Sequence, residues 1–241
     1  DDITVSTASG GTSGTISIAT NDAANEIADL VNAAAATSGN GITATATNVS
    51  YISGVSADGN VSFTLASDDG DSAIADADAG ITTIAVTSAD YSALVTSINA
   101  NFATTGIIAE AVVMGGGDAG VKLTQVDGKD ITIGTFVNSA GGTISVGKSD
   151  TTATNTAAAG ALTSGAATNS SRLSGTVTLT SSQGAIAVGG ALATTTSAVA
   201  STAASLTSVS VATASSAASA LATIDAALDT VNSGRGALGA I

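Results

Sequence analysis

Hydrophobic and polar residues alternate over short stretches in the first half of the chain. Thr15–Thr20 and Thr83–Thr87 alternate with the period of two that is typical of β-strands. A segment with helical periodicity follows each stretch. It opens on a residue favoured at helix N-caps, Asn21 or Asp22 in the first segment and Ser88 in the second. The pattern therefore predicts a strand followed by a helix, twice.

These two patterns belong to a longer internal repeat. Both copies end the helix on an apolar residue followed by Asn-Ala, at 31–33 and 98–100, and both start a new strand at a Gly-Ile pair, at 41–42 and 106–107. A further strand is expected after each, over 61–66 in the first copy and over 121–125, extended by 130–134, in the second. The matched helix positions are Ile27, Leu30 and Val31 in one copy and Leu94, Ser97 and Ile98 in the other. Each unit is predicted to be a strand-helix-strand-strand module of the α+β class, with its helix on one face of the sheet.

The second half of the chain has weaker patterns. Residues 149–170 are rich in Ala, Thr, Ser and Gly without periodicity, which is typical of a loop or linker. Residues 172–189 are expected to form a β-hairpin around Ser181–Gly184. Ser197–Leu206 is expected to be a short helix or an ordered loop.

The last residues, 217–241, carry a narrow apolar stripe on an otherwise small and polar helix. The stripe residues recur at steps of three, four or seven, and they are Leu221, Ile224, Leu228, Val231 and Leu238. A seam of this width is the coiled-coil kind and requires a partner helix. An isolated helix of this length is marginal in water, so the pattern predicts a long amphipathic C-terminal helix that acts in assembly.

The same segment resembles the C-terminal core helix of bacterial flagellins. The residues that carry the resemblance are Ile224-Asp225-Ala226-Ala227-Leu228, Val231-Asn232-Ser233, Arg235 and Leu238-Gly239-Ala240-Ile241. Ser208–Val211 also resembles the strand that leads into that helix. Gly234 and Gly236 depart from the family pattern, and each lowers helix propensity by about 1 kcal/mol relative to Ala.

The internal repeat resembles the hook IN motif of flagellar filament proteins, through the Asn-Ala close and the Gly-Ile restart of each copy. The resemblance implies that residues 1–195 are an outer, surface-exposed region, with modules at about 14–66 and 80–134. Residues 196–241 would then be the C-terminal part of the filament core domain. Nothing at Asp1–Gly14 resembles the N-terminal core helices of the family. The chain is therefore expected to be a fragment trimmed at both ends, and to be monomeric on its own.

Composition excludes several classes of function. The 241 residues include no Cys, His, Pro or Trp, and only 2% are aromatic. Five basic and nineteen acidic residues give a formal charge of −14, which disfavours nucleic acid as a partner. No apolar run reaches the length of a membrane span, so membrane insertion is not expected. An extracellular location on the bacterial flagellum follows from the resemblance alone.

Candidate chemistry is sparse. Without His or Cys, the chain has no Ser-His-Asp triad, no Cys-His pair and no standard zinc site, and we predict no catalytic residue and no cofactor. One acidic loop could offer oxygen ligands to Ca²⁺, although its spacing does not match an EF-hand; its carboxylates are Asp68, Asp69, Asp71, Asp76 and Asp78. The glycine run at 115–120 is better explained as a hairpin turn than as a phosphate loop.

These observations favour a structural protein, a flagellin-like subunit of the bacterial flagellar filament that assembles with other subunits and serves motility. Two alternatives from other classes remain open at this point. One is an adhesin-like or glycan-binding cell-surface module that uses the same repeats. The other is an enzyme whose carboxylates act without the aromatic platforms usual in glycoside hydrolases.

Overall fold

The computed structural model describes residues 2–7, 10–68, 79–114, 117–148, 158–190 and 200–203. Over these residues it contains fourteen strands and three helices, and its longest helix has 15 residues. The chain divides into two compact units. Unit 1 takes its described residues from Asp1–Thr20, Ile27–Thr45 and Val177–Ile241, and unit 2 from Asn21–Glu26 and Ala46–Thr176.

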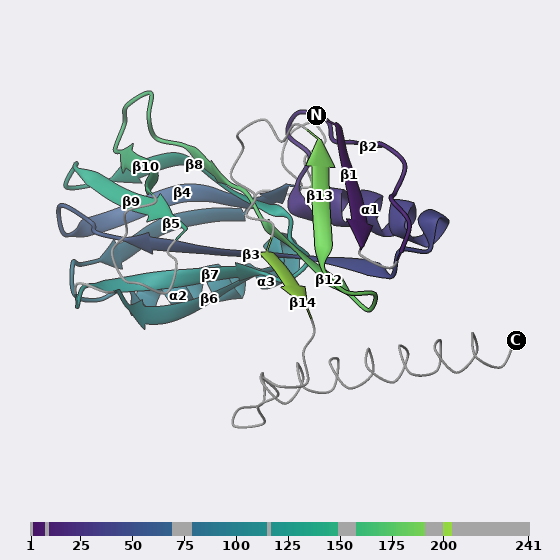
Figure 1. The fold of residues 1–241 in the computed structure, drawn as a ribbon. Helices are drawn as coiled ribbons and strands as arrows, with labels where there is room; N and C mark the ends of the chain where they lie inside the picture. Colours follow the sequence, from purple (N-terminus) through teal and green to yellow (C-terminus); the bar gives the residue numbers. More distant parts are fainter. Residues whose placement is uncertain are drawn as a thin grey trace, which may run out of the picture. The chain divides into compact units, whose positions relative to one another are not determined.

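Unit 1 contains a small antiparallel sheet. Its central strand β1 (Asp2–Thr7) pairs with β13 (Ile186–Gly190) on one side and with β2 (Ile16–Ser17) on the other (Figure 1). The alternation of β1 explains its orientation, because Ile3 and Val5 are buried while Thr4 and Ser6 are partly exposed.

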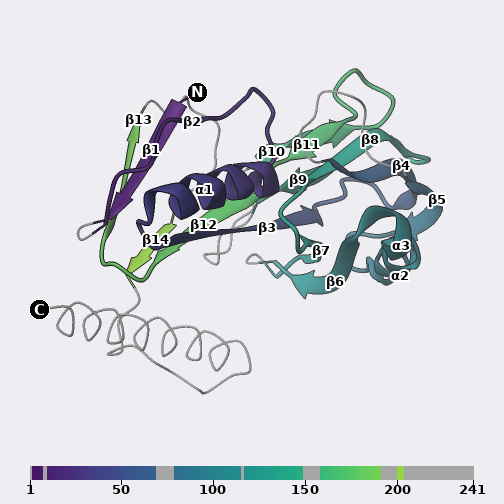
Figure 2. The same ribbon diagram turned by 90° about the vertical axis from the view of Figure 1, so that its right-hand side faces the viewer.

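Most of helix α1 (Ala24–Ser38) and the first residues of strand β3 (Ile42–Ser53) also belong to unit 1. Strand β12 (Thr176–Ser181) runs beside β3 and pairs in parallel with β14 (Ala200–Ala203). Figure 2 shows α1 alongside β12 and β3. The interior of this unit is small; its buried apolar residues include Ile3, Val5, Ile16, Ala28, Val31, Ala35, Ile42, Ala44, Val177 and Leu179.

Unit 2 holds the larger core, formed between two groups of antiparallel strands. One group has the order β11-β8-β4-β5, from Ser171–Leu173, Asp130–Asn138, Gly59–Asp68 and Ala79–Val86. In the other, β3 pairs with β7 (Ala119–Gln125) and β9 (Thr143–Gly147), β6 (Ile107–Val113) pairs with β7, and β10 (Ala158–Thr163) pairs with β9.

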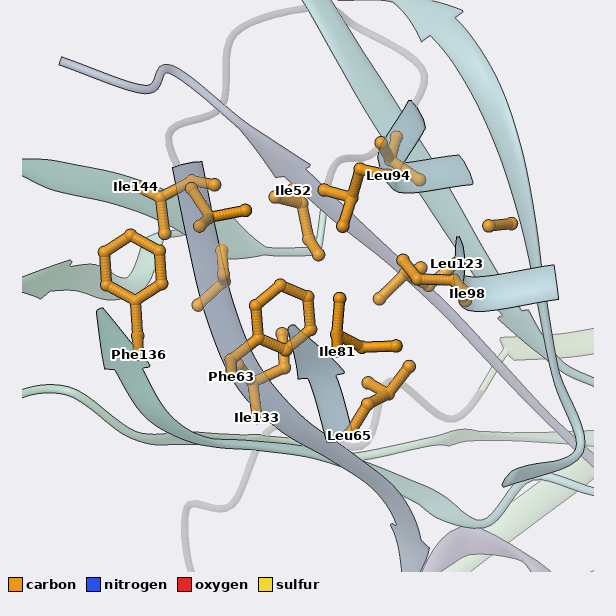
Figure 3. Close-up of a cluster of buried hydrophobic side chains, with 14 of the residues drawn as sticks. Ile52, Phe63, Leu65, Ile81, Leu94, Ile98, Leu123, Ile133, Phe136 and Ile144 are labelled. Atoms are coloured by element: carbon orange, nitrogen blue, oxygen red, sulfur yellow. The ribbon is translucent and has the colours of Figure 1, made fainter. Parts of the chain in front are cut away.

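Helices α2 (Ser92–Ala100) and α3 (Phe102–Thr105) connect β5 to β6. In Figure 3 side chains from both groups of strands and from α2 point toward one another, and the labelled ones are Ile52, Phe63, Leu65, Ile81, Leu94, Ile98, Leu123, Ile133, Phe136 and Ile144. At roughly 1.5–3 kcal/mol for each fully buried large side chain, this cluster is the main source of stability of unit 2.

The α+β prediction is wrong. The described part of the chain is mainly antiparallel β-structure, and its three helices are short. The predicted pair of equivalent strand-helix-strand-strand modules is wrong, because β3 and β4 lie in different sheets whereas β6 and β7 are paired, and because β5 pairs with β4 instead of β6. The predicted hairpin at 172–189 is also wrong, since β12 pairs beside β3 and β13 pairs with β1. The long C-terminal helix and its stripe from Leu221 to Leu238 lie outside the described residues.

The two segments do share one local feature, the corner that leads from each helix into the next strand. Gly41 and Gly106 have left-handed φ angles of 66° and 64° immediately before their strands. The side chain just before each glycine caps the first strand amide: Ile42 N donates to Asn40 Oδ1 at 3.1 Å, and Ile107 N donates to Thr105 Oγ1 at 3.2 Å. Positive φ is readily available to glycine, which explains why both corners carry it.

Helix α2 begins through a different residue from the one expected. The amide of Ser92 donates to Asp90 Oδ1 at 2.8 Å, whereas the amide of Ser88 donates to Asp58 Oδ1 at 2.8 Å. This hydrogen bond to the Ser92 amide is the main cause that lowers the pKa of Asp90. The N-cap position is Tyr91, whose side chain makes no capping hydrogen bond, so the expected cap at Ser88 is wrong; Asp90, two residues further along, bonds the first amide of the helix instead.

Two exposed threonines adopt backbone angles that are unfavourable for a β-branched residue. Thr83 has a φ of 56° and Thr135 a φ of 51°. They lie in β5 and β8, where the pairing of each strand with β4 shifts register at Ser62 and Phe63. The amide of Thr83 donates to Ser62 Oγ at 3.0 Å, which helps to hold the irregular backbone.

Replacing Thr83 by Gly is expected to raise the free energy of unfolding by about 1 kcal/mol, because glycine relieves the left-handed strain. Thr82→Gly is the matched control, since Thr82 is also exposed and adjacent but has no positive φ. It should lower the free energy of unfolding by about 0.5–1 kcal/mol. Urea unfolding followed by circular dichroism measures both, and equal effects would contradict a strained Thr83.

Candidate functional site

The most concentrated charged site in the described residues lies in unit 2, where β4, β8 and β11 begin or end. Asp130 opens β8 and stands directly opposite Asp68, the last residue of β4. Two carboxylates in facing positions repel each other. Arg172 of β11 compensates for this, with Nε 2.6 Å from Asp130 Oδ2 and Nη1 3.6 Å from Asp68 Oδ2.

Asp130 is the buried member of this group, with a side chain that is only 3% exposed. Its second carboxylate oxygen accepts a hydrogen bond from Gly175 N at 3.1 Å. Burial is the largest influence on this carboxyl group and raises the pKa of Asp130, with Asp68 adding in the same direction, while Arg172 and Gly175 oppose the shift. Arg172 also donates from Nη2 to Asn21 O at 3.0 Å, so it ties the segment before α1 to the same site.

Two further polar side chains lie in the same part of unit 2. Lys148 donates from Nζ to Thr176 Oγ1 at 3.2 Å. Burial lowers the pKa of Lys148, and the negative charge of Asp130 acts in the opposite direction. Asn48 is fully buried; its Nδ2 donates to the main-chain oxygens of Lys129 at 3.0 Å and Leu173 at 2.6 Å. A buried polar group is tolerable only when it is hydrogen-bonded in this way.

The side chains of this site join segments that are far apart in the sequence. Both oxygens of Asp130 are engaged, and the guanidinium of Arg172 reaches three partners from different segments. The chain has no His or Cys that could serve as a base or a nucleophile beside them. The geometry therefore holds β4, β8, β11 and the Asn21 segment together.

The sequence-predicted ion site is represented by only one of its members. Asp68 is described, and it makes the ion pair with Arg172. Asp69, Asp71, Asp76 and Asp78 lie outside the described residues. Within the described part of the chain, no group of three or more Asp or Glu side chains is placed to hold a metal ion.

The glycine-rich run between β6 and β7 closes a β-hairpin, as its sequence predicted. The strands pair in continuous antiparallel register from Ile107↔Gln125 to Val113↔Ala119. At the turn, Met114 N donates to Asp118 O at 2.7 Å, and Gly117 has a φ of 90°. A glycine in this conformation is a requirement of the turn.

Tyr91 is a second buried polar group in unit 2, separate from the charged site. Its hydroxyl oxygen accepts a hydrogen bond from Val55 N at 2.9 Å, and the residue is 2% exposed. Burial raises the pKa of Tyr91, since the charged phenolate is poorly solvated there, and the carboxylates of Asp118 and Asp58 add to the effect.

Tyr91→Phe is expected to lower the free energy of unfolding near neutral pH by about 1–3 kcal/mol, because Val55 N loses its buried partner. The folded pKa of Tyr91 is raised above 10.0, so its contribution is complete below pH 10.0 and is lost as pH rises through the folded pKa. The wild type should therefore lose stability above pH 10 more steeply than the variant. Urea midpoints from pH 8 to 11 test this, and parallel curves would contradict it.

Comparison with known proteins does not assign a function to this chain. No protein-family model matches the sequence, and neither does any curated protein. Among the described residues, no helix is long and apolar enough to cross a membrane.

Proposed function

We propose that this chain is a structural, surface-displayed part of a flagellin-like filament subunit. The observation that carries the proposal is the path of the chain through its two units. The described residues that precede and follow unit 2, which are 2–7, 10–20, 177–190 and 200–203, belong to unit 1. The two segments of unit 2, 21–26 and 46–176, thus alternate with segments of unit 1 along the chain, and this connectivity suits a region displayed on the surface of an assembly.

The residues that carry the sequence resemblance agree with this proposal. The Asn-Ala and Gly-Ile pairs that resemble the hook IN motif are the residues that build the two corners. At the other end of the chain, the apolar stripe from Leu221 to Leu238 resembles the core helix through which flagellins assemble, and we propose it as the assembly surface.

The chemistry of unit 2 also favours a structural role. Its buried carboxylate Asp130 and its neighbour Asp68 form ion pairs with Arg172 that join strands. The formal charge of −14 makes neighbouring copies repel each other except where specific contacts form, which suits a surface displayed at high density. Partners in this proposal are other copies of the subunit, outside the cell.

Immunogold electron microscopy of cells that produce the protein tests the proposal. Antibodies raised against the purified chain should label flagellar filaments along their length, and cells lacking the gene should be unlabelled. Labelling of the cell body with bare filaments would refute the filament assignment and would favour an adhesin-like surface protein.

A further inference from the structure

Asn32 and Asn99 make the same pair of hydrogen bonds to the edge of a strand. Asn99 Nδ2 donates to Ala109 O at 2.9 Å, and Ala109 N donates to Asn99 Oδ1 at 2.8 Å. Asn32 Nδ2 donates to Ala44 O at 2.9 Å, and Ala44 N donates to Asn32 Oδ1 at 2.7 Å. Each side-chain amide thus presents one donor and one acceptor, as a residue of a neighbouring strand would.

At β6 these bonds identify which backbone groups face away from the sheet. Ala109 stands opposite Leu123 of β7, but both of its main-chain groups bond to Asn99. In an antiparallel pair the inward and outward directions alternate along the strand, so Ile107, Ala111 and Val113 face outward with Ala109. The bond from Ile107 N to Thr105 Oγ1 agrees with that direction.

The β6 edge has the properties of a surface that pairs with another strand. Among the described strands, β6 pairs only with β7, so its other side is an edge of the sheet. The sequence Ile107–Val113 is apolar apart from Glu110, and the side chain of Val113 is 78% exposed. Edges with these features tend to extend by pairing with a further chain.

The position of Asn99 decides how long such a pairing could be. Two β6 edges from separate copies would align best around Ala111, because that register sets Glu110 against Val112 of the other copy and keeps the two glutamates from facing each other. In the same register, Ala109 of each copy pairs with Val113 of the other, which gives two such pairs. Since Asn99 already occupies both groups of Ala109, it removes both of these pairs and leaves only the one at Ala111.

We propose that Asn99 is an edge cap that keeps β6 from pairing with β6 of a second copy of this chain. Asn32 is its counterpart for β3. Strand β12 lies on one side of β3, and the side-chain amide of Asn32 hydrogen-bonds to Ala44 on the other side. The inference goes beyond the proposed function and does not depend on it, because it concerns the purified chain and rests on the hydrogen bonds, pairing and sequence of its own strands.

Asn99→Leu tests the cap, since leucine has a similar size and cannot form either bond. The variant should at least double its apparent mass in light scattering as its concentration is raised, with a gain of β-sheet signal in infrared spectra. Asn101→Leu is the matched control, because the side chain of Asn101 donates to Ser97 O within the same helical segment and not to a strand; this variant should remain monomeric like the wild type.

A second substitution identifies the associating edge. Ala111→Pro removes an amide that faces away from β7, and proline is tolerated at such positions of edge strands. Adding it to Asn99→Leu should restore the monomer. A monomeric Asn99→Leu variant that retains its fold, or association that Ala111→Pro does not reverse, would overturn the proposal.

Hydrogen exchange of the wild type decides the question even where a variant does not fold. The amide of Ala109 should exchange slowly because Asn99 protects it. The amides of Ala111 and Val113 should exchange at least tenfold faster, as uncapped outward groups. Equal protection at all three positions would show that the edge is already covered and would overturn the role of Asn99.

Discussion

Ile98→Asp is expected to abolish the cooperative folding of unit 2. Ile98 is fully buried in α2 and belongs to the cluster that joins both groups of strands. An aspartate there loses the apolar contacts and places an unpaired charge in the core, at a combined cost of about 5 kcal/mol or more. A loss of that size is comparable to the whole stability of an ordinary domain.

Ala93→Asp is the matched control for this variant. Ala93 lies on the same helix, is exposed, and is in the first turn, where a negative charge is mildly favourable. It should change the free energy of unfolding by no more than about 0.5 kcal/mol. Urea titrations followed by circular dichroism and tyrosine fluorescence measure both; a cooperative, near-wild-type transition for Ile98→Asp would contradict the described core.

Asp130→Ala is expected to lower the free energy of unfolding by about 3 kcal/mol. The carboxylate accepts one charged hydrogen bond from Arg172 and one from Gly175 N, and the substitution leaves the buried amide without a partner.

The exposed pair between Glu110 and Lys122 is the control for Asp130. Glu110 Oε2 and Lys122 Nζ are 2.9 Å apart, but the Glu110 side chain is 58% exposed and the Lys122 side chain 32% exposed. Glu110→Ala should therefore cost less than about 1 kcal/mol, as is usual for surface ion pairs. Similar losses for Asp130→Ala and Glu110→Ala would show that the buried site is no more than a surface contact.

Local features of the fold followed from the sequence. The apolar periodicity around Leu94 and Ile98 predicted α2, and both of these residues are buried as expected. The matched Asn-Ala and Gly-Ile pairs marked two corners that have the same hydrogen bonds. Strand β1 was missed, although the alternation of Ile3 and Val5 carries the signal for it.

The pairing of strands did not follow, because period-two alternation identifies a strand without identifying its neighbour. Residues in β3 and β4 look like successive strands of one module, yet β4 pairs with β5 and β8, and β3 with β7 and β9. Similarly, β12 and β13 are close in sequence and join different sheets. Non-local pairing depends on the whole interior, which a short window cannot represent.

The charged site was missed for the same reason. Asp68 was predicted as a member of an acidic loop, and its interaction with Arg172 joins positions more than a hundred residues apart. The available signal was the scarcity of basic residues, since the chain has only five. In an acidic chain, an arginine within a short strand, such as Arg172 in β11, is a candidate for a buried partner of a carboxylate.

Protease treatment of isolated flagellar filaments tests the central claim most directly. Filaments sheared from producing cells should contain this chain as a major component by peptide mass spectrometry. Brief digestion of intact filaments should release peptides from residues 46–176, the main part of unit 2, before peptides from residues 217–241. Absence of the chain from the filament fraction, or release of residues 217–241 first, would contradict a filament subunit that displays unit 2 on its surface.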